Sequence, residues 1–259
     1  GALDLHLWLA GSSMAKLYPI LGVTLPDTPA YATRGRLTAT LGRSGSRFGY
    51  HGFRAHVGGS DLAGDVDYVT GDARPKLSGK VQATLLRLAD LAPLVGGSGS
   101  STTAPPPAAS DRVLPTQAFR TDRWKAMDAN VTFAAGRIEH GPSLPIQSLS
   151  THLVMDDGTL TLDPLHFGVA GGQVDGMLRL DGGAAPMRGA LKLGARRLRI
   201  HQLSQGFAAM RTSLGEINGD AALVARGDDV AALLGSASGQ LKLLMDNGAI
   251  SRNLLETAG

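Results

Sequence analysis

Hydrophobic and polar residues alternate along much of the chain, and this period of two predicts β-strands that bury one face. The pattern begins at once, where Leu3, Leu5, Leu7 and Leu9 fall on one side of the first predicted strand. Similar alternation recurs in segments 36–41, 77–85, 127–133, 149–155, 191–193, 217–225 and 241–245. Because sheets with one solvated face are usually antiparallel, the sequence predicts a mainly β fold built on a long antiparallel sheet.

Turn-forming residues separate some of these strands. Asp157–Gly158, Asp181–Gly183 and Asn247–Gly248 are typical of tight turns between antiparallel strands. At Asp163–Pro164 the alternation changes phase by one residue. A proline inside a strand favours an edge strand or a β-bulge, and a bulge accounts for the phase change.

Two short segments have helical rather than strand periodicity. In residues 12–21, apolar side chains follow two serines suited to capping a helix, and residues 88–95 show a matching pattern. Each segment contains a proline and is followed by a glycine, Gly22 or Gly96, that suits a helix C-terminus. The sequence therefore predicts only a few short helices beside the sheet.

A resemblance between the two halves of the chain indicates an internal repeat. The spacing of apolar residues and glycine in residues 62–68 is found again in 174–180, and that of 77–81 is found again in 187–191. In this alignment the second copy is two residues shorter between the matched stretches. A structural unit of paired strands that occurs more than once in the chain would account for this repeated spacing.

A stretch of Gly, Ser, Thr, Pro and Ala lies between the two copies and has no side chains able to support a core. This composition predicts a flexible linker or long loop over residues 97–112. The first β region then covers residues 1–96 and the second covers residues 113–259. Both regions could share one continuous sheet.

Composition and charge narrow the functional classes. With 43% hydrophobic and 18% charged residues, the chain can bury a substantial core. The absence of cysteine excludes disulfides and thiolate chemistry. The net charge of +3, without a run of Lys and Arg among aromatics, gives no support to nucleic-acid binding. No apolar stretch is long enough to span a bilayer and no signal peptide is visible, so any anchor is expected outside this sequence.

Candidate catalytic and metal-binding residues do not form a recognisable site. The histidines lack metal-ligand spacing, and His51 and His56 are expected on opposite faces of a strand. Asp61, Asp65 and Asp67 resemble a cation cluster, but no further ligands follow, and solvent-facing strand positions are the favoured interpretation. The sequence therefore predicts a protein that is not an enzyme and has no metal or other cofactor.

Four segments, in order along the chain, resemble the AsmA family. They are residues 12–35, residues 60–64 (Ser-Asp-Leu-Ala-Gly), residues 155–172, and residues 230–239 with the Asn-Gly-Ala-Ile of 247–250. The resemblance implies an AsmA-like periplasmic domain, related to TamB and to the bridge-like lipid transfer proteins. It implies a curled sheet that forms a hydrophobic groove, and an inner-membrane anchor that precedes this sequence in the full-length protein.

The function implied by this resemblance is lipid binding and lipid transfer in the periplasm. Such a module supports phospholipid transport between the inner and outer membranes and outer-membrane homeostasis. Its partners are phospholipid or another lipid and the bacterial membranes, with envelope proteins as further candidates and no nucleic acid. The alternative is a scaffold or assembly factor for outer-membrane proteins that acts through exposed strand edges.

The apolar side chains on one face of the predicted strands are candidates for contact with an acyl chain, because few helices are available to cover them. A closed sandwich core is the alternative for the same residues. The candidates are Leu5, Leu7, Leu37, Leu41, Leu77, Val81, Val131, Phe133, Leu160, Leu162, Phe167, Leu178, Leu180, Leu191, Leu193, Leu223, Leu241 and Leu243.

Overall fold

The structure is a computed structural model, and it describes residues 1–17, 28–87, 90, 119, 121–139, 146–203 and 214–249. Within these residues the chain forms twelve strands that belong to one sheet. The strands are β1 (Ala2–Gly11), β2 (Tyr31–Leu41), β3 (Ser46–Val57), β4 (Ser60–Val69), β5 (Lys76–Arg87), β6 (Asp128–Glu139), β7 (Ile146–Asp156), β8 (Thr159–Val169), β9 (Gly172–Asp181), β10 (Arg188–Arg199), β11 (Leu214–Arg226) and β12 (Ser238–Ala249).

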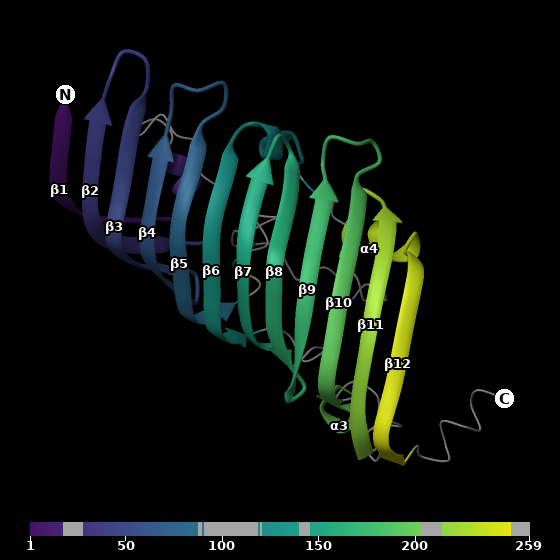
Figure 1. The fold of residues 1–259 in the computed structure, drawn as a ribbon. Coiled ribbons are helices and arrows are strands. Elements are labelled where there is room, and N and C mark those ends of the chain that lie inside the picture. The colour runs from purple at the N-terminus through teal and green to yellow at the C-terminus, as the bar shows by residue number, and fades with distance from the viewer. Residues whose placement is uncertain are drawn as a thin grey trace, which may run out of the picture.

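The strands follow one another across the sheet in the order of the sequence, from β1 at one edge to β12 at the other (Figure 1). Every neighbouring pair is antiparallel except β5 and β6, which are parallel. The predicted long antiparallel sheet is therefore confirmed, with this one exception. Parallel neighbours cannot be joined by a tight turn. The predicted linker at 97–112 belongs to the connection between these two strands and lies outside the described residues.

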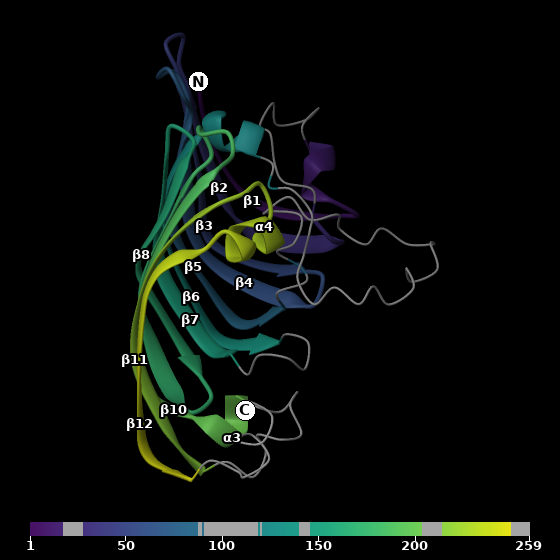
Figure 2. The ribbon, with the colours of Figure 1, turned by 90° about the vertical axis from the view of Figure 1, so that its right-hand side faces the viewer.

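The sheet is curved, and its concave side carries the short helices (Figure 2). These helices are η1 (Met14–Leu17), η2 (Thr121–Lys125), α3 (Ile200–Leu203) and α4 (Val230–Gly235). η1 follows Ser13, whose hydroxyl accepts a hydrogen bond from the Ala15 N–H. The rest of the predicted helix at 12–21 lies outside the described residues, as does the predicted helix at 88–95 apart from Asp90.

β-Bulges keep the apolar residues of long strands on one face, and those in β8 and β3 are examples. In β8 the register shifts around Asp163–Pro164, so the predicted bulge is confirmed there. In β3 the register shifts around Gly52, whose N–H donates a hydrogen bond to the Asp65 carboxylate over 2.8 Å. Each extra residue restores the phase of the alternation, and the apolar face therefore continues to the end of the strand. The prediction that His51 and His56 lie on opposite faces is wrong, because the bulge at Gly52 places both on the same face.

Two of the predicted turns are present, and the third is wrong. Asp157–Gly158 joins β7 to β8 with φ angles of 45° and 78°, and Gly182–Gly183 follows the end of β9. Asn247–Gly248 instead belongs to β12, at a point where its register with β11 shifts. Pairing with β11 outweighs the local preference of Asn-Gly for a turn, and the pair forms a bulge.

The two stretches of the predicted repeat lie in two hairpins, β4–β5 and β9–β10, but their alignment changes. β9 has the same length as β4, β10 has the same length as β5, and the two connections are equally long. The two-residue deletion predicted from the sequence is therefore wrong, and Leu77 corresponds to Gly189 rather than to Met187. Alternation with a period of two looks unchanged after a shift of two residues, so only the strand bounds resolve the alignment.

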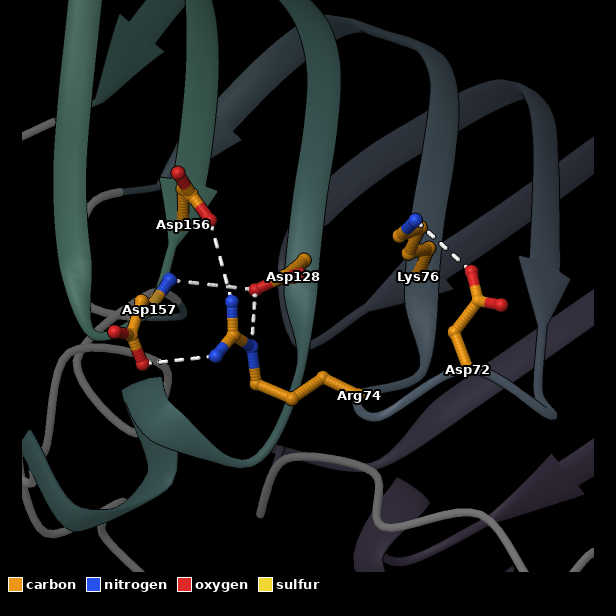
Figure 3. A network of polar contacts seen from close by, with 6 residues as sticks. All are labelled: Asp72, Arg74, Lys76, Asp128, Asp156 and Asp157. Carbon is orange, nitrogen blue, oxygen red and sulfur yellow. Dashed lines mark hydrogen bonds and ion pairs between the residues drawn. The ribbon is translucent and has the colours of Figure 1, made fainter.

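A polar network ties the two halves together beside the parallel strand pair (Figure 3). The Arg74 guanidinium, just before β5, lies 2.8 Å from a carboxylate oxygen of Asp128 at the start of β6. It also lies 3.3 Å from Asp156 and 2.8 Å from Asp157, at the turn between β7 and β8. The hydrogen bond from Arg74 holds the pKa of the Asp128 carboxyl below its usual range. One arginine thus joins three successive strand ends.

Candidate lipid-binding face

The register of the strands places apolar residues side by side in rows that cross the whole sheet. One row contains a residue from every strand, and we name it the central row. From β1 to β12 its residues are Leu5, Leu37, Tyr50, Val66, Gly79, Val131, Leu153, Leu162, Leu178, Leu191, Leu223 and Gly239. Since neighbouring strands are about 4.8 Å apart, the row extends for about 50 Å.

The central row lies on the concave side of the sheet. Leu178 of this row and Leu180 are two residues apart in β9 and share a face. Leu180 forms a buried cluster with Met187 and Trp124, and Leu233 of α4 packs against that cluster. Figure 2 shows α4 on the concave side, and the central row therefore faces the same way.

The register places all of the predicted groove residues on this concave face. Most of them are half-buried, and Leu180 is buried. Leu41, Leu241 and Leu243 are 54%, 63% and 65% exposed. The structure thus unites these residues on one surface, and their contact with lipid stays a prediction.

Buried clusters flank the central row toward both ends of the strands. At one end, Leu180 and Met187 are covered by Trp124 of η2. At the other end the clusters consist of Ala83, Leu86, Ala135 and Ile138, and of Val169, Ala170, Val174 and Leu198. Along the central row, the residues with side chains are half-buried. Protein therefore closes the concave face near the strand ends and leaves its middle partly open.

None of the described strand residues on the concave face has an acidic or basic side chain. Charged residues of the strands alternate with the apolar ones and lie on the convex face. There they form ion pairs between neighbouring strands, such as Arg36 with Asp4 and Arg196 with Asp220. A hydrocarbon chain on the concave face would thus meet no charged strand residue between β1 and β12.

Three tyrosines of the described residues indicate the apolar character of the concave face. Burial raises the pKa of the phenols of Tyr31, Tyr50 and Tyr68 above the usual value of 10.0. The Tyr50 ring stacks on Phe53 with a centroid distance of 5.4 Å, and its hydroxyl lies 2.8 Å from the Thr33 hydroxyl. These phenols remain neutral at pH 7, and the face gains no charge from them.

The predicted groove set omits Tyr50, Val66 and Leu153, although all three belong to the central row. Around Tyr50 the bulge at Gly52 interrupts the alternation that would have revealed its face. The change of phase there is the same signal that identified the bulge at Asp163–Pro164. Applied to β3, it would have placed Tyr50 and, through it, Val66 on the concave face.

Two shallow hollows lie on the convex face rather than on the concave one. The larger, about 660 Å³, is lined by residues that include Asp175, Lys192, Asp220 and Lys242. The other, about 530 Å³, lies near the turn between β7 and β8. Each lining mixes three carboxylates with two cations. The uncharged concave face is therefore the better candidate for a functional site.

An open twelve-stranded sheet with an uncharged concave face and a charged convex face defines a β-groove protein. The chain belongs to the AsmA family, whose family model matches residues 9–258. It is 45% identical over 273 aligned residues to AsmA family protein YhjG of Escherichia coli (strain K12). That match covers 100% of this chain and 40% of the relative, so the chain spans well under half of the relative's length. No solved structure matches the chain significantly.

Family membership supports, in general terms, a role connected with lipid transport or with the cell envelope. Among the helices in the described residues, none has the length and hydropathy needed to cross a membrane.

Proposed function

We propose that this chain is a periplasmic lipid-binding module that carries phospholipid acyl chains along its concave face between the inner and outer membranes. The observation that carries the proposal is the central row, which is continuous over twelve strands, uncharged and only half-buried. Apolar surface that stays partly exposed is costly in water, and an acyl chain would remove it from solvent. Each methylene buried in this way contributes roughly 0.8 kcal/mol.

The dimensions of the face suit a lipid tail. One leaflet of a bilayer has a hydrocarbon depth of roughly 15 Å, which is half of the core thickness. The central row, at about 50 Å, is several times longer than one tail. A tail lying along this row finds aliphatic residues on most strands, including Leu153, Leu162, Leu178 and Leu191. Movement from one strand to the next then exchanges one uncharged contact for another, because the described strand residues of this face carry no charge.

A binding role fits the chemistry of the chain better than catalysis. The charged groups with short contacts, such as Arg74 and Arg196, join strands as ion pairs on or near the convex face. Asp61 accepts hydrogen bonds from the backbone N–H groups of Thr84 and Leu85 and thereby supports the end of β5. These side chains have structural partners, and the proposed function requires neither a catalytic group nor a cofactor.

A charged side chain in the central row tests the proposal directly. We expect the purified chain to take up phospholipid, detected by lipid extraction and mass spectrometry, and we expect Leu191→Asp to abolish most of that uptake. Ala190→Asp is the matched control, because Ala190 is the preceding residue of β10 and lies on the convex face opposite Arg179. A wild-type protein that remains free of lipid would refute the proposal, as would equal uptake by both variants.

Membrane location and direction of transport belong to the same proposal. We propose that the full-length protein is anchored in the inner membrane, so that the groove receives lipid from that side. The support is membership of the AsmA family together with a continuous apolar row that can guide a tail away from the membrane. Crosslinking from Leu5 and Leu223 in cells would locate lipid at both ends of the row.

The second candidate is a scaffold for outer-membrane proteins, and the exposed edge at β12 favours it. Leu241, Leu243 and Met245 on the concave side and Leu244 on the convex side are all exposed. An edge strand with unpaired backbone groups and apolar side chains can accept a strand from a client protein. A photo-crosslinker at Leu244 that captures outer-membrane proteins, while the concave face captures no lipid, would favour this function over lipid transfer.

A further inference from the structure

On the convex face of β1, β2 and β3, arginines outnumber carboxylates. β4 and β5 contain three carboxylates and three cations. A second excess of cations lies in β9 to β11, with seven cations and four carboxylates, but those strands contain no tryptophan. In β1 to β3 the cations dominate, with one carboxylate only. The charged and titratable side chains of this surface, which we name the basic patch, are Arg34, Arg36, Arg47, Arg54, His6, His51, His56 and Asp4.

An exposed tryptophan lies inside the basic patch. Trp8 of β1 is directly opposite Arg34 of β2, and Arg34 is directly opposite Arg54 of β3, so the three side chains form one row. Trp8 is 71% exposed, the highest fraction among the large hydrophobic residues that the structure describes. Aromatic side chains of this size are usually buried or engaged in an interface.

Arg34 and Arg54 lack an acidic partner within the described residues. Like charges directly opposite each other in an antiparallel pair destabilise the sheet. The neighbouring carboxylates are already engaged: Asp4 pairs with Arg36, and Asp61 accepts two backbone hydrogen bonds from β5. Asp65 and Asp67 lie 3.7 Å and 3.9 Å from the ring nitrogens of His51, and Asp65 also accepts a hydrogen bond from the Gly52 N–H. An anion from outside the protein would therefore complement this arginine pair.

We propose that the basic patch docks the protein on the surface of an anionic phospholipid bilayer, with Trp8 at the level of the head groups and Arg34 and Arg54 against lipid phosphates. Tryptophan favours this level because one end of its side chain is apolar and the other is polar. Arginines near the surface add electrostatic attraction that salt screens. The basic patch and the central row lie on opposite faces, so docking leaves the concave face open.

Vesicle flotation tests this proposal with a matched control. With vesicles of phosphatidylethanolamine and phosphatidylglycerol, we expect Arg34→Gln/Arg54→Gln to weaken binding about 25-fold, taking about fivefold for each arginine. Arg188→Gln/Arg226→Gln removes the same charge from another cross-strand arginine pair on the convex face, where Asp181 lies opposite Arg188. The control should bind like the wild type, and none of the proteins should bind phosphatidylcholine vesicles appreciably.

Tryptophan fluorescence supplies an independent readout. The chain has two tryptophans, and Trp124 is 8% exposed whereas Trp8 is 71% exposed. In a Trp124→Phe background, emission from Trp8 should shift to shorter wavelength when anionic vesicles are added. High salt should reverse that shift, and Trp8→Ala should weaken flotation.

Three outcomes would overturn the proposal: unchanged flotation of Arg34→Gln/Arg54→Gln, equal loss in the Arg188 and Arg226 control, or an unshifted Trp8 emission. Tight binding of duplex DNA at the basic patch in place of vesicle binding would also overturn it. Lipid uptake into the groove is measured separately, and Arg34→Gln/Arg54→Gln should retain it. The docking proposal and the groove-binding proposal can therefore be refuted separately.

Discussion

The two faces of the sheet are built from the same strands, yet they offer opposite chemistry. On the convex face, charged side chains form ion pairs between neighbouring strands, and these side chains are exposed to solvent. On the concave face, the described strand residues carry no charge, and buried clusters flank a half-buried central row. The concave face therefore has two parts. The parts near the strand ends are covered by protein, whereas the central row stays partly exposed.

Leucines on the concave face therefore have two roles, one in stabilising the fold and one in the proposed lipid binding. Leu86 is 0% exposed and packs with Ala83, Ala135 and Ile138, so it stabilises the fold. Leu191 lies on the same concave face but remains half-buried in the central row. We therefore expect the first leucine to matter for folding and the second to matter for binding.

The largest expected effect comes from truncating the buried leucine. Leu86→Ala should lower the free energy of unfolding by about 2–5 kcal/mol, because it removes a packed side chain and leaves a cavity. Leu191→Ala should cost less than half as much in lipid-free protein, because water already reaches that side chain. Urea denaturation monitored by circular dichroism measures both losses. Equal losses would show that the central row is as closed as the flanking clusters.

A smaller effect is expected from breaking the polar network around Arg74. Arg74→Gln removes the cation shared by Asp128, Asp156 and Asp157, and should modestly lower the urea midpoint at pH 7. Lys76→Gln is the matched control, because Lys76 forms its ion pair with the exposed Asp72 rather than with a carboxylate of the network (Figure 3). A control that destabilises the chain as much as Arg74→Gln would contradict a special role for the network.

Arg74→Gln should also change how the stability of the protein depends on pH in the acidic range. The hydrogen bond from Arg74 lowers the pKa of Asp128 from its ordinary value of 3.8, so the folded state favours the carboxylate. That contribution is present above pH 3.8 and is lost as the pH falls through the folded-state pKa. Arg74→Gln should therefore flatten this part of the profile, which urea midpoints at a series of acidic pH values would reveal.

The smallest expected effect lies at alkaline pH and belongs to the concave face. Burial raises the pKa of Tyr50 and Tyr68, so their contribution to stability is complete below pH 10.0 and is lost as the pH rises through the folded-state pKa. Tyr50→Phe/Tyr68→Phe should flatten the alkaline decline without changing the acid side. A spectrophotometric titration of the phenols gives the direct check, and ordinary tyrosine titration would contradict this account.

The strands and the face of each leucine could be predicted from the sequence, because side chains alternate strictly along a strand. The bulge at Asp163–Pro164 was visible for the same reason. The turn predicted at Asn247–Gly248 was wrong, because local preference could not reveal that β11 pairs with this segment. The repeat was shifted by two residues, because alternation does not distinguish positions two residues apart.

The order of neighbouring residues is enough to specify a mainly β chain with one apolar and one polar face. The parallel pairing of β5 and β6, the continuity of one sheet from β1 to β12, and the place of Tyr50 and Val66 in the central row became visible in the folded chain. The folded chain also brings Trp8, Arg34 and Arg54 together in a single row. These features depend on the register between segments that are distant in the sequence. Alternation within one strand shows which face each residue occupies, but not which strand pairs with it.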